Sequence, residues 1–150
     1  WRETYRGLLP EEYLSKLNFR KKIDAWQKVL CDSKRFIVFV AEDRVGVIGF
    51  ATFESARDDS WRAFGEVTSI YLLSRFKGRG VGRALLQAGM RELAKRNFQQ
   101  AYCWILEGNP SVHFYEASGA TYSGQSKDDE IGGRKIKELA YVWENLDHFK

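Results

Sequence analysis

The stretch Lys77-Gly78-Arg79-Gly80-Val81-Gly82-Arg83-Ala84 joins an apolar strand pattern to an amphipathic helix pattern. Glycine at alternate positions lets the main chain turn tightly and approach a ligand with no Cβ atom in the way. The helix that follows begins at the glycines, so unpaired N–H groups and the positive end of its dipole face the same space. Arg79 and Arg83 add full positive charges. The junction is therefore predicted to bind a phosphorylated ligand.

The spacing of these residues excludes two nucleotide-binding motifs. A dinucleotide fingerprint that starts at Gly78 fits at Gly80 but needs a small residue where Arg83 stands. A Walker A loop needs Gly, four residues and then Gly-Lys-Ser/Thr, and the sequence contains no such run. What remains is a basic residue at Lys77, two residues, Gly80, one residue and Gly82.

With this loop the sequence resembles the GNAT family of N-acetyltransferases, whose pyrophosphate loop reads Gln/Arg-x-x-Gly-x-Gly/Ala. Lys77 takes the first position and keeps the charge, whereas Gly80 and Gly82 match the pattern. A second segment, 108–119, resembles the family's motif B, although Tyr115 follows Asn109 one residue sooner than usual. Two motifs in the family's order are more specific than one, and the resemblance covers nearly all of the chain.

The order of the predicted elements agrees with that family. A strand over 65–73 precedes the glycine loop, and a helix that ends near 96, a strand over 100–106 and a short helix over 109–119 follow it. Flanking segments predict the end of a helix at 1–5, a turn at 7–10, a helix over 19–31, a hairpin of 35–40 with 47–53, and a final hairpin of 120–125 with 135–143 around a polar loop. The chain is predicted to be a single α/β domain, residues 1–150, with a mixed central sheet flanked by helices on both faces. The family has a further strand and most of a helix before the segment that Trp1 begins, so we expect the true N-terminus to be missing.

Composition limits the classes of partner. The chain has 150 residues and a net charge of +4, its basic residues are interleaved with acids, and its apolar runs are only strand-length, so neither nucleic acid nor a membrane is an expected partner. Cys31 and Cys103 lie in patterns predicted to be buried, which suits a reducing cytoplasm. His113 and His148 lack the spacing of metal ligands, so no metal is expected. The sequence leaves open a monomer or a homodimer.

Two side chains are candidate catalytic residues. Glu66 lies fourteen residues before Gly80, the spacing at which some family members carry the glutamate that deprotonates the acceptor amine. A solvated carboxylate at a strand end is the alternative, and the sequence does not choose between them. The resemblance places Tyr115 at the sulfur of the cofactor, where a phenol can protonate the leaving thiolate. A core aromatic residue is the alternative for Tyr115.

The resemblance implies acetyl-CoA as co-substrate. The backbone of Ile70, Tyr71 and Leu72 would hold the pantetheine arm and polarise the thioester carbonyl, and Asn109 of motif B would also contact the cofactor. The pyrophosphate would lie on the loop Lys77, Gly78, Arg79, Gly80, Val81, Gly82 and Arg83. The implied reaction is transfer of the acetyl group to a primary amine of a small molecule or protein by direct attack in a ternary complex. A non-catalytic acyl-CoA-binding sensor or scaffold of the same fold is the alternative.

Two groups of side chains bear on the acceptor. Acidic residues flank both expected walls of the cleft at 58–59 and 128–130, and they are predicted to steer a cationic amine, with solvated loops as the alternative. Five aromatic residues are expected in the core or at its edge, with the option of lining an acceptor pocket: Trp61, Phe64, Trp104, Tyr141 and Trp143.

Overall fold

The computed structural model describes residues 2–44 and 46–149. The helices and strands in chain order are α1 (Glu11–Ser15), α2 (Phe19–Cys31), β1 (Ile37–Asp43), β2 (Gly46–Ser55), β3 (Gly65–Leu72), α3 (Val81–Lys95), β4 (Ala101–Leu106), α4 (Val112–Glu116), β5 (Thr121–Ile131) and β6 (Arg134–Trp143). The strands form one sheet in the order β1-β2-β3-β4-β6-β5. Neighbours are antiparallel except β3 and β4, which are parallel. The sheet is therefore mixed, as predicted.

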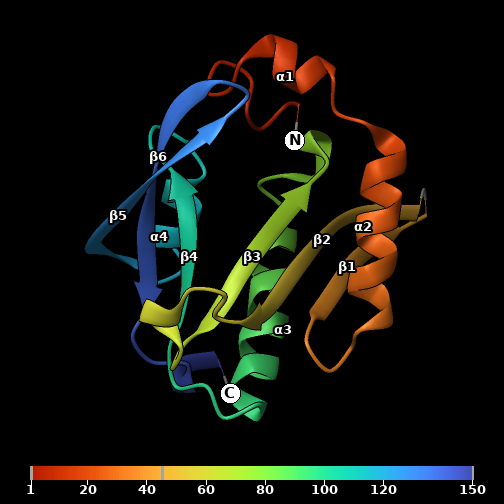
Figure 1. Cartoon of the computed structure of the whole chain (residues 1–150). Helices are drawn as coiled ribbons and strands as arrows, with labels where there is room; N and C mark the ends of the chain where they lie inside the picture. Colours follow the sequence, from red (N-terminus) through yellow and green to blue (C-terminus); the bar gives the residue numbers. More distant parts are fainter. Residues whose placement is uncertain (1, 45, 150) are drawn as a thin grey trace.

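Helices cover both faces of this sheet, which confirms the predicted architecture. On one face α3 buries Leu86, Met90 and Leu93 against the strands. On the other face α2 lies across β1 and β2 (Figure 1), where the Trp26 ring meets the Phe50 ring edge-on at a centroid distance of 4.8 Å. Apolar burial on the α3 side forms the larger core, and its strands carry the candidate site.

The contact between α3 and β2 depends on Gly89. A Cβ atom at this position would lie 1.9 Å from Cζ of the Phe53 ring, well inside any van der Waals contact. Phe53 itself is fully buried. The missing side chain therefore allows the helix to pack directly on the ring.

Strands β3 and β4 pair only where they begin. Their register holds Gly65 opposite Ala101 and Glu66 opposite Tyr102, after which the two strands diverge (Figure 1). Beyond Glu66, no strand among the described residues pairs with the side of β3 that faces β4.

A bulge in β3 accompanies this divergence. Phe53 of β2 pairs with Val67 but Thr52 pairs with Ser69, so Thr68 is the additional residue. The Thr52 hydroxyl lies 2.6 Å from the Thr68 hydroxyl and 2.5 Å from the Ser69 hydroxyl, and these hydrogen bonds hold the bulge. A bulge turns the strand locally, next to the gap between β3 and β4.

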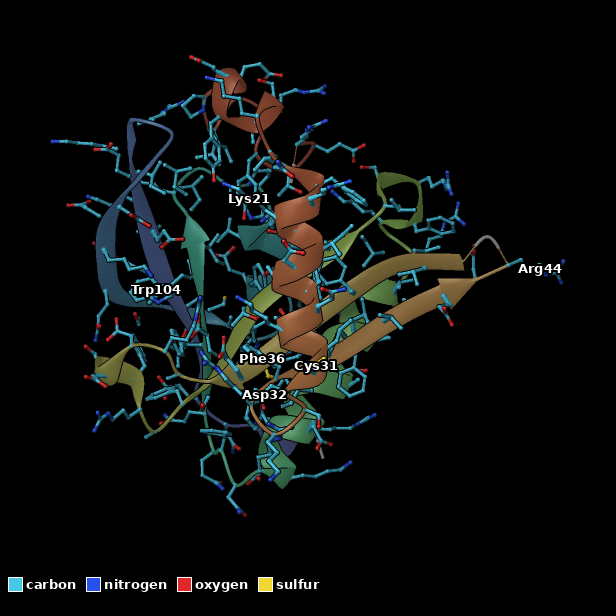
Figure 2. The ribbon with its side chains drawn as sticks, turned by 45° about the vertical axis from the view of Figure 1, so that its right-hand side comes forward. Lys21, Cys31, Asp32, Phe36, Arg44 and Trp104 are labelled. Carbon is cyan, nitrogen blue, oxygen red and sulfur yellow. The ribbon has the colours of Figure 1, made fainter. Side chains whose placement is uncertain are left out.

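Two predictions near the N-terminus are wrong. Residues 2–5 form turns rather than a helix end, and the chain turns again after Tyr5, whose carbonyl accepts hydrogen bonds of 3.0 Å from the main-chain N–H groups of Leu8 and Leu9. Trp1 lies outside the described residues. Cys31 is exposed rather than buried, since α2 lies on the surface and buries none of its residues. Figure 2 shows Cys31 at the end of α2, beside Asp32 and Phe36.

The final hairpin is longer than predicted. The acidic segment 128–130 belongs to β5 and does not form a loop. Two of its three acidic residues lie opposite lysines across the strand pair, Asp128 opposite Lys137 and Glu130 opposite Lys135, whereas Asp129 lies opposite Ile136. Opposite charges in such cross-strand positions stabilise pairing, so the polar run continues the strand. Within the described residues, no helix has both the length and the apolar character that crossing a membrane requires.

Candidate active site

A cavity of about 350 Å³ occupies the space between the diverging halves of β3 and β4. Its lining includes five of the predicted site residues: Glu66, Ile70, Tyr71, Asn109 and Tyr115. They come from β3, from the turn after β4 and from α4. The structure thus brings both candidate catalytic side chains to one cavity.

Tyr115 lies on α4 with its ring against aromatic neighbours. The ring centroid is 5.1 Å from that of Phe114 and 6.0 Å from that of Trp143. Within the described residues, the hydroxyl makes no hydrogen bond. Burial raises the pKa of Tyr115 above its ordinary value, so the phenol stays protonated at neutral pH. The phenol is thus half-buried, lines the cavity and carries a proton, as the predicted role of Tyr115 requires.

Asn109 holds the turn between β4 and α4. Its side-chain Oδ1 accepts a hydrogen bond of 2.9 Å from the main-chain N–H of Ser111, and its own N–H donates to the Leu106 carbonyl at 2.9 Å. The side chain is buried. These bonds fix the turn that carries α4, and with it Tyr115, beside the end of β4.

The glycine loop lies next to the cavity rather than in its wall. Gly78 and Gly80 have φ of +73° and +80°, the left-handed region that glycine tolerates best, and Gly80 directly precedes α3. A Cβ atom at Gly82 would lie 3.3 Å from the Phe114 ring and 3.8 Å from the Leu72 side chain. The first turn of α3 therefore packs between the end of β3 and α4.

The charges of this loop remain free to meet a ligand. Lys77, Arg79 and Arg83 are exposed. Leu72 and the loop residues lie outside the lining of the cavity, whereas Ile70 and Tyr71 lie within it. The predicted cofactor-binding residues thus divide into a group that lines the cavity and a group that lies on the surface beside it.

Glu66 is not a solvated strand-end carboxylate, because its exposed fraction is 1%. Its Oε2 accepts hydrogen bonds from the main-chain N–H of Arg57 at 3.1 Å and from the Tyr102 hydroxyl at 2.9 Å. The Arg57 guanidinium pairs with both carboxylate oxygens. Burial alone would raise the pKa of Glu66, but the hydrogen bonds and the charge of Arg57 outweigh it and lower that pKa. The carboxylate is ionised and only weakly basic.

A second buried carboxylate shares the same arginine. Glu54 of β2 lies opposite Glu66 in the register, and Nε of Arg57 is 3.6 Å from Glu54 Oε1. On its other side Glu54 accepts a hydrogen bond of 2.9 Å from Nε of Arg35. Arg57 therefore compensates two buried charges and ties the loop after β2 to the sheet.

Sequence reasoning missed Arg57 and Tyr102. Arg57 lies in an irregular segment whose position no periodicity predicts. Tyr102 could have been found, because Glu66 and Tyr102 are both the second residue of neighbouring parallel strands, each after a small residue. Equivalent positions in paired strands carry side chains on the same face.

Aromatic and charged side chains line the part of the cavity formed by β4, β5 and β6. Trp104, Lys127, Asp129 and Glu138 line it, and a second, more open hollow beside it is lined by Arg57, Asp58, Glu66, Tyr102, Trp104 and Lys127. Asp58 and Asp129 are thus the two predicted steering residues that reach these hollows. Asp59 pairs instead with Arg62 at 2.8 Å.

The predicted aromatic residues divide between core and cavity. Trp61 stacks on Tyr102 at a centroid distance of 4.8 Å and meets Phe64 edge-on at 5.0 Å. Tyr141 and Trp143 belong to the main core. Trp104 is the member of the set that lines the cavity.

The surroundings of Cys103 do not favour a role for its thiol as a nucleophile. The side chain is buried in β4, and burial raises the pKa of its thiol. Among residues 2–44 and 46–149, no three His, Cys, Asp or Glu side chains are grouped so that they could hold a metal ion.

A sheet that opens between two parallel strands, with a glycine loop at the start of the next helix and a tyrosine facing the opening, describes an acetyltransferase of the GNAT class. The chain belongs to that family: the family model described as "Acetyltransferase (GNAT) family" matches residues 1–120. The predicted resemblance is confirmed, and the protein is an acetyl-transferring enzyme.

Individual relatives of the chain are also acetyltransferases by name. The chain is 37% identical over 154 residues to the "Uncharacterized N-acetyltransferase YuaI" of Bacillus subtilis, an alignment that covers all of this chain and 84% of the relative. Two solved structures share the fold. One is the PaiA N-acetyltransferase of Thermoplasma acidophilum in complex with coenzyme A, with a TM-score of 0.71, 20% identity, and coverage of 92% of this chain and 84% of the other. The other is YncA, a putative acetyltransferase of Salmonella typhimurium with its cofactor acetyl-CoA, with a TM-score of 0.66, 20% identity, and coverage of 87% and 75%.

Proposed function

We propose that this enzyme transfers the acetyl group of acetyl-CoA to a primary amine of a small molecule or protein by direct attack in a ternary complex. The observation that carries the proposal is the cavity between β3 and β4, where the strands no longer pair, with β3 on one wall and the Tyr115 phenol on another. The loop that begins at Lys77 adjoins it.

Acetyl-CoA is the proposed co-substrate. We place the pantetheine arm along β3 at Ile70, Tyr71 and Leu72, where main-chain groups that point toward β4 would bond its amides as a neighbouring strand does. The loop offers main-chain N–H groups and the charges of Lys77, Arg79 and Arg83 to the pyrophosphate. The coenzyme A and acetyl-CoA complexes of the two structural relatives support acetyl-CoA as the co-substrate.

The proposed chemistry needs no acyl-enzyme. The ammonium group of the acceptor first loses one proton to water. The neutral amine nitrogen then attacks the thioester carbonyl carbon, and a C–N bond forms while the carbonyl oxygen gains negative charge. As the C=O bond re-forms, the C–S bond breaks, and the departing thiolate takes the proton of the Tyr115 hydroxyl. The ammonium proton of the attacking nitrogen leaves through water, and Tyr115 regains its proton from solvent. The amide and the free thiol of coenzyme A are the products.

For Glu66 we propose a positioning role in place of the general base that the spacing suggests. Its oxygens are engaged by Arg57 and Tyr102, and its lowered pKa makes it a poor proton acceptor for an alkylammonium ion. The residue instead fixes Tyr102, whose ring stacks on Trp61.

The acceptor is proposed to be cationic before it reacts. Asp58, Asp129 and Glu138 line the hollows at the end of the cavity away from the basic loop. A negative end opposite a positive end steers an ammonium ion toward one and acetyl-CoA toward the other.

The test of the proposed function is release of free thiol from acetyl-CoA by the purified protein with a panel of amines. The panel contains polyamines, amino acids, aminoglycosides and a peptide with a free N-terminus. We expect thiol release with at least one cationic amine, and mass spectrometry should find the acetylated amine in equal amount. A reaction without amine measures hydrolysis. Thiol release that no amine increases would contradict the proposal.

A further inference from the structure

Lys127 places its own ammonium group at the acceptor end of the cavity. The Lys127 Nζ lies 3.1 Å from Oε2 of Glu138 and 4.3 Å from the centroid of the Trp104 ring. Lys127 comes from β5, Glu138 from β6 and Trp104 from β4, and all three line the cavity that also holds Tyr115. Figure 2 shows Trp104 on the part of the sheet away from α2.

This arrangement has the composition of a binding site for a primary ammonium ion. An indole face attracts a cation through its quadrupole, and a carboxylate supplies the opposite charge and hydrogen-bond acceptors. The strand register explains how the three side chains meet. On one side of β6, Glu138 lies opposite Lys127 of β5. On the other side it lies opposite Leu106 of β4, which is two residues from Trp104. A lysine side chain is itself a primary alkylamine, so Lys127 fills the site with the functional group that we propose as the acceptor.

The lysine can leave this position at low cost. Its side chain is 41% exposed and that of Glu138 is 24% exposed, so water can replace each partner. Exposed ion pairs and exposed cation–π contacts each contribute little to stability. By contrast, Glu66 is buried and engaged by Arg57, so it is not free to bind an amine.

We infer that Trp104 and Glu138 form the ammonium subsite for the acceptor and that Lys127 occupies it as an internal substitute that the acceptor must displace. The inference rests on the proposed function and narrows the acceptor to primary alkylammonium compounds. Its consequence is that removing the Lys127 ammonium group strengthens binding of a cation at Trp104 and Glu138. An effect of net charge alone would be the same for an exposed lysine outside the cavity.

The experiment compares Lys127→Met and Lys127→Gln with the parent and with Lys135→Met. Lys135 is exposed in the same hairpin and lies outside the cavity lining, so its loss gives the same change in net charge. The probe is n-pentylamine, a single ammonium on a lysine-length chain, with n-pentanol as its neutral counterpart. NMR titration follows the Trp104 indole N–H signal, which the Trp104→Leu variant identifies.

We expect both Lys127 variants to bind pentylamine about fivefold more tightly than the parent, the size of the two displaced contacts combined. Lys135→Met should bind it no more than slightly more tightly, and pentanol should bind none of the proteins better. Adding Glu138→Gln to Lys127→Met should abolish the gain. Equal or weaker binding by the Lys127 variants, or an equal gain in Lys135→Met, would overturn the inference.

A second measurement separates this inference from the proposed function. In the thiol-release assay, KM for pentylamine should fall in Lys127→Met while KM for acetyl-CoA stays unchanged. If no amine supports thiol release, the proposed function fails, and the titration still decides the subsite. If transfer occurs but KM for pentylamine does not fall in Lys127→Met, the proposed function stands and the subsite is wrong.

Discussion

Arg57 compensates two buried carboxylates, so its replacement tests whether Glu66 is held as a charged group. In Arg57→Met the guanidinium contacts with Glu66 and Glu54 are lost. Two hydrogen bonds to Glu66 remain, those from the main-chain N–H of residue 57 and from the Tyr102 hydroxyl. The variant therefore leaves one almost fully buried carboxylate with hydrogen bonds but without an opposite charge.

The structure sets the expected magnitude. Removing one partner of a buried ion pair costs roughly 3–5 kcal/mol of the free energy of unfolding. The Arg57 side chain is 55% exposed, so water screens this pair and replaces part of the lost contact. We therefore expect Arg57→Met to lower the free energy of unfolding by about 2–4 kcal/mol at pH 8.

The destabilisation should depend on pH in a defined direction. Arg57 lowers the pKa of Glu66 in the folded parent, so this pair contributes stability above the ordinary pKa and loses it as pH falls through the lowered one. In the variant, burial remains without the cation, so the pKa of Glu66 rises above its ordinary value. As pH falls from 8 toward 5, Glu66 of the variant takes up a proton and its buried charge disappears. The difference between parent and variant should then shrink.

Urea denaturation at pH 8 and pH 5 measures this difference. Arg62→Met is the matched control, because Arg62 lies on the same loop and pairs with exposed Asp59. It should change the free energy of unfolding by less than about 0.5 kcal/mol at either pH. A loss in Arg57→Met no larger than that of the control, or a loss that grows as pH falls, would refute the reasoning.

Three further outcomes are expected. Gly89→Ala places a methyl group on the Phe53 ring, and calorimetry should find the melting temperature lower by roughly 6–12 °C, the shift for a loss of about 3 kcal/mol; an unchanged melting temperature would show that the ring has room to move. Gly80→Asp should weaken acetyl-CoA binding by about 10-fold to 100-fold in calorimetry, whereas Gly80→Ala, which has the same left-handed strain without the charge, should weaken it less; equal affinities for both would exclude an anion site at the loop. Glu66→Gln should lower kcat without moving the acid limb of the pH–rate profile, and loss of that limb would restore Glu66 as the general base.

Local sequence patterns were sufficient to predict β3 and α3, the two elements that flank the glycine loop. The apolar run of β3, the glycines and the periodicity of α3 lie within one continuous segment, and their consequences depend on neighbours in sequence. The family resemblance predicted that Tyr115 faces the gap between the two central strands, and Tyr115 lines the cavity there.

The contacts of Glu66 could not be read in the same way. They depend on Arg57, which comes from an irregular loop, and on Tyr102, which comes from a strand 36 residues later. A carboxylate at a strand end is exposed or buried according to whether such distant groups meet it. The sequence therefore left a solvated group and a catalytic base open, and the structure supports a third role.

The prediction of a loop at the acidic run 128–130 was wrong for a different reason. Polarity alone predicts a loop, but a strand face can carry acidic residues when they meet opposite charges across the pair, as Asp128 and Glu130 do. Lys135 and Lys137 supply those charges, and they lie on the strand that follows a turn at Gly132 and Gly133. The two segments 128–130 and 135–137 taken together carry the signal for a strand pair, because the first is acidic and lysines alternate in the second.

The most direct test of the central claim is the turnover of Tyr115→Phe with acetyl-CoA and an amine that the parent accepts. Within the described residues the hydroxyl makes no hydrogen bond, so its removal deletes a proton donor and leaves the ring packing on Phe114 and Trp143 in place. We predict that kcat falls by about 10²-fold to 10⁴-fold, with the affinity for acetyl-CoA and the melting temperature nearly unchanged. An unchanged kcat together with a melting temperature several degrees lower would make Tyr115 a core residue and contradict the account.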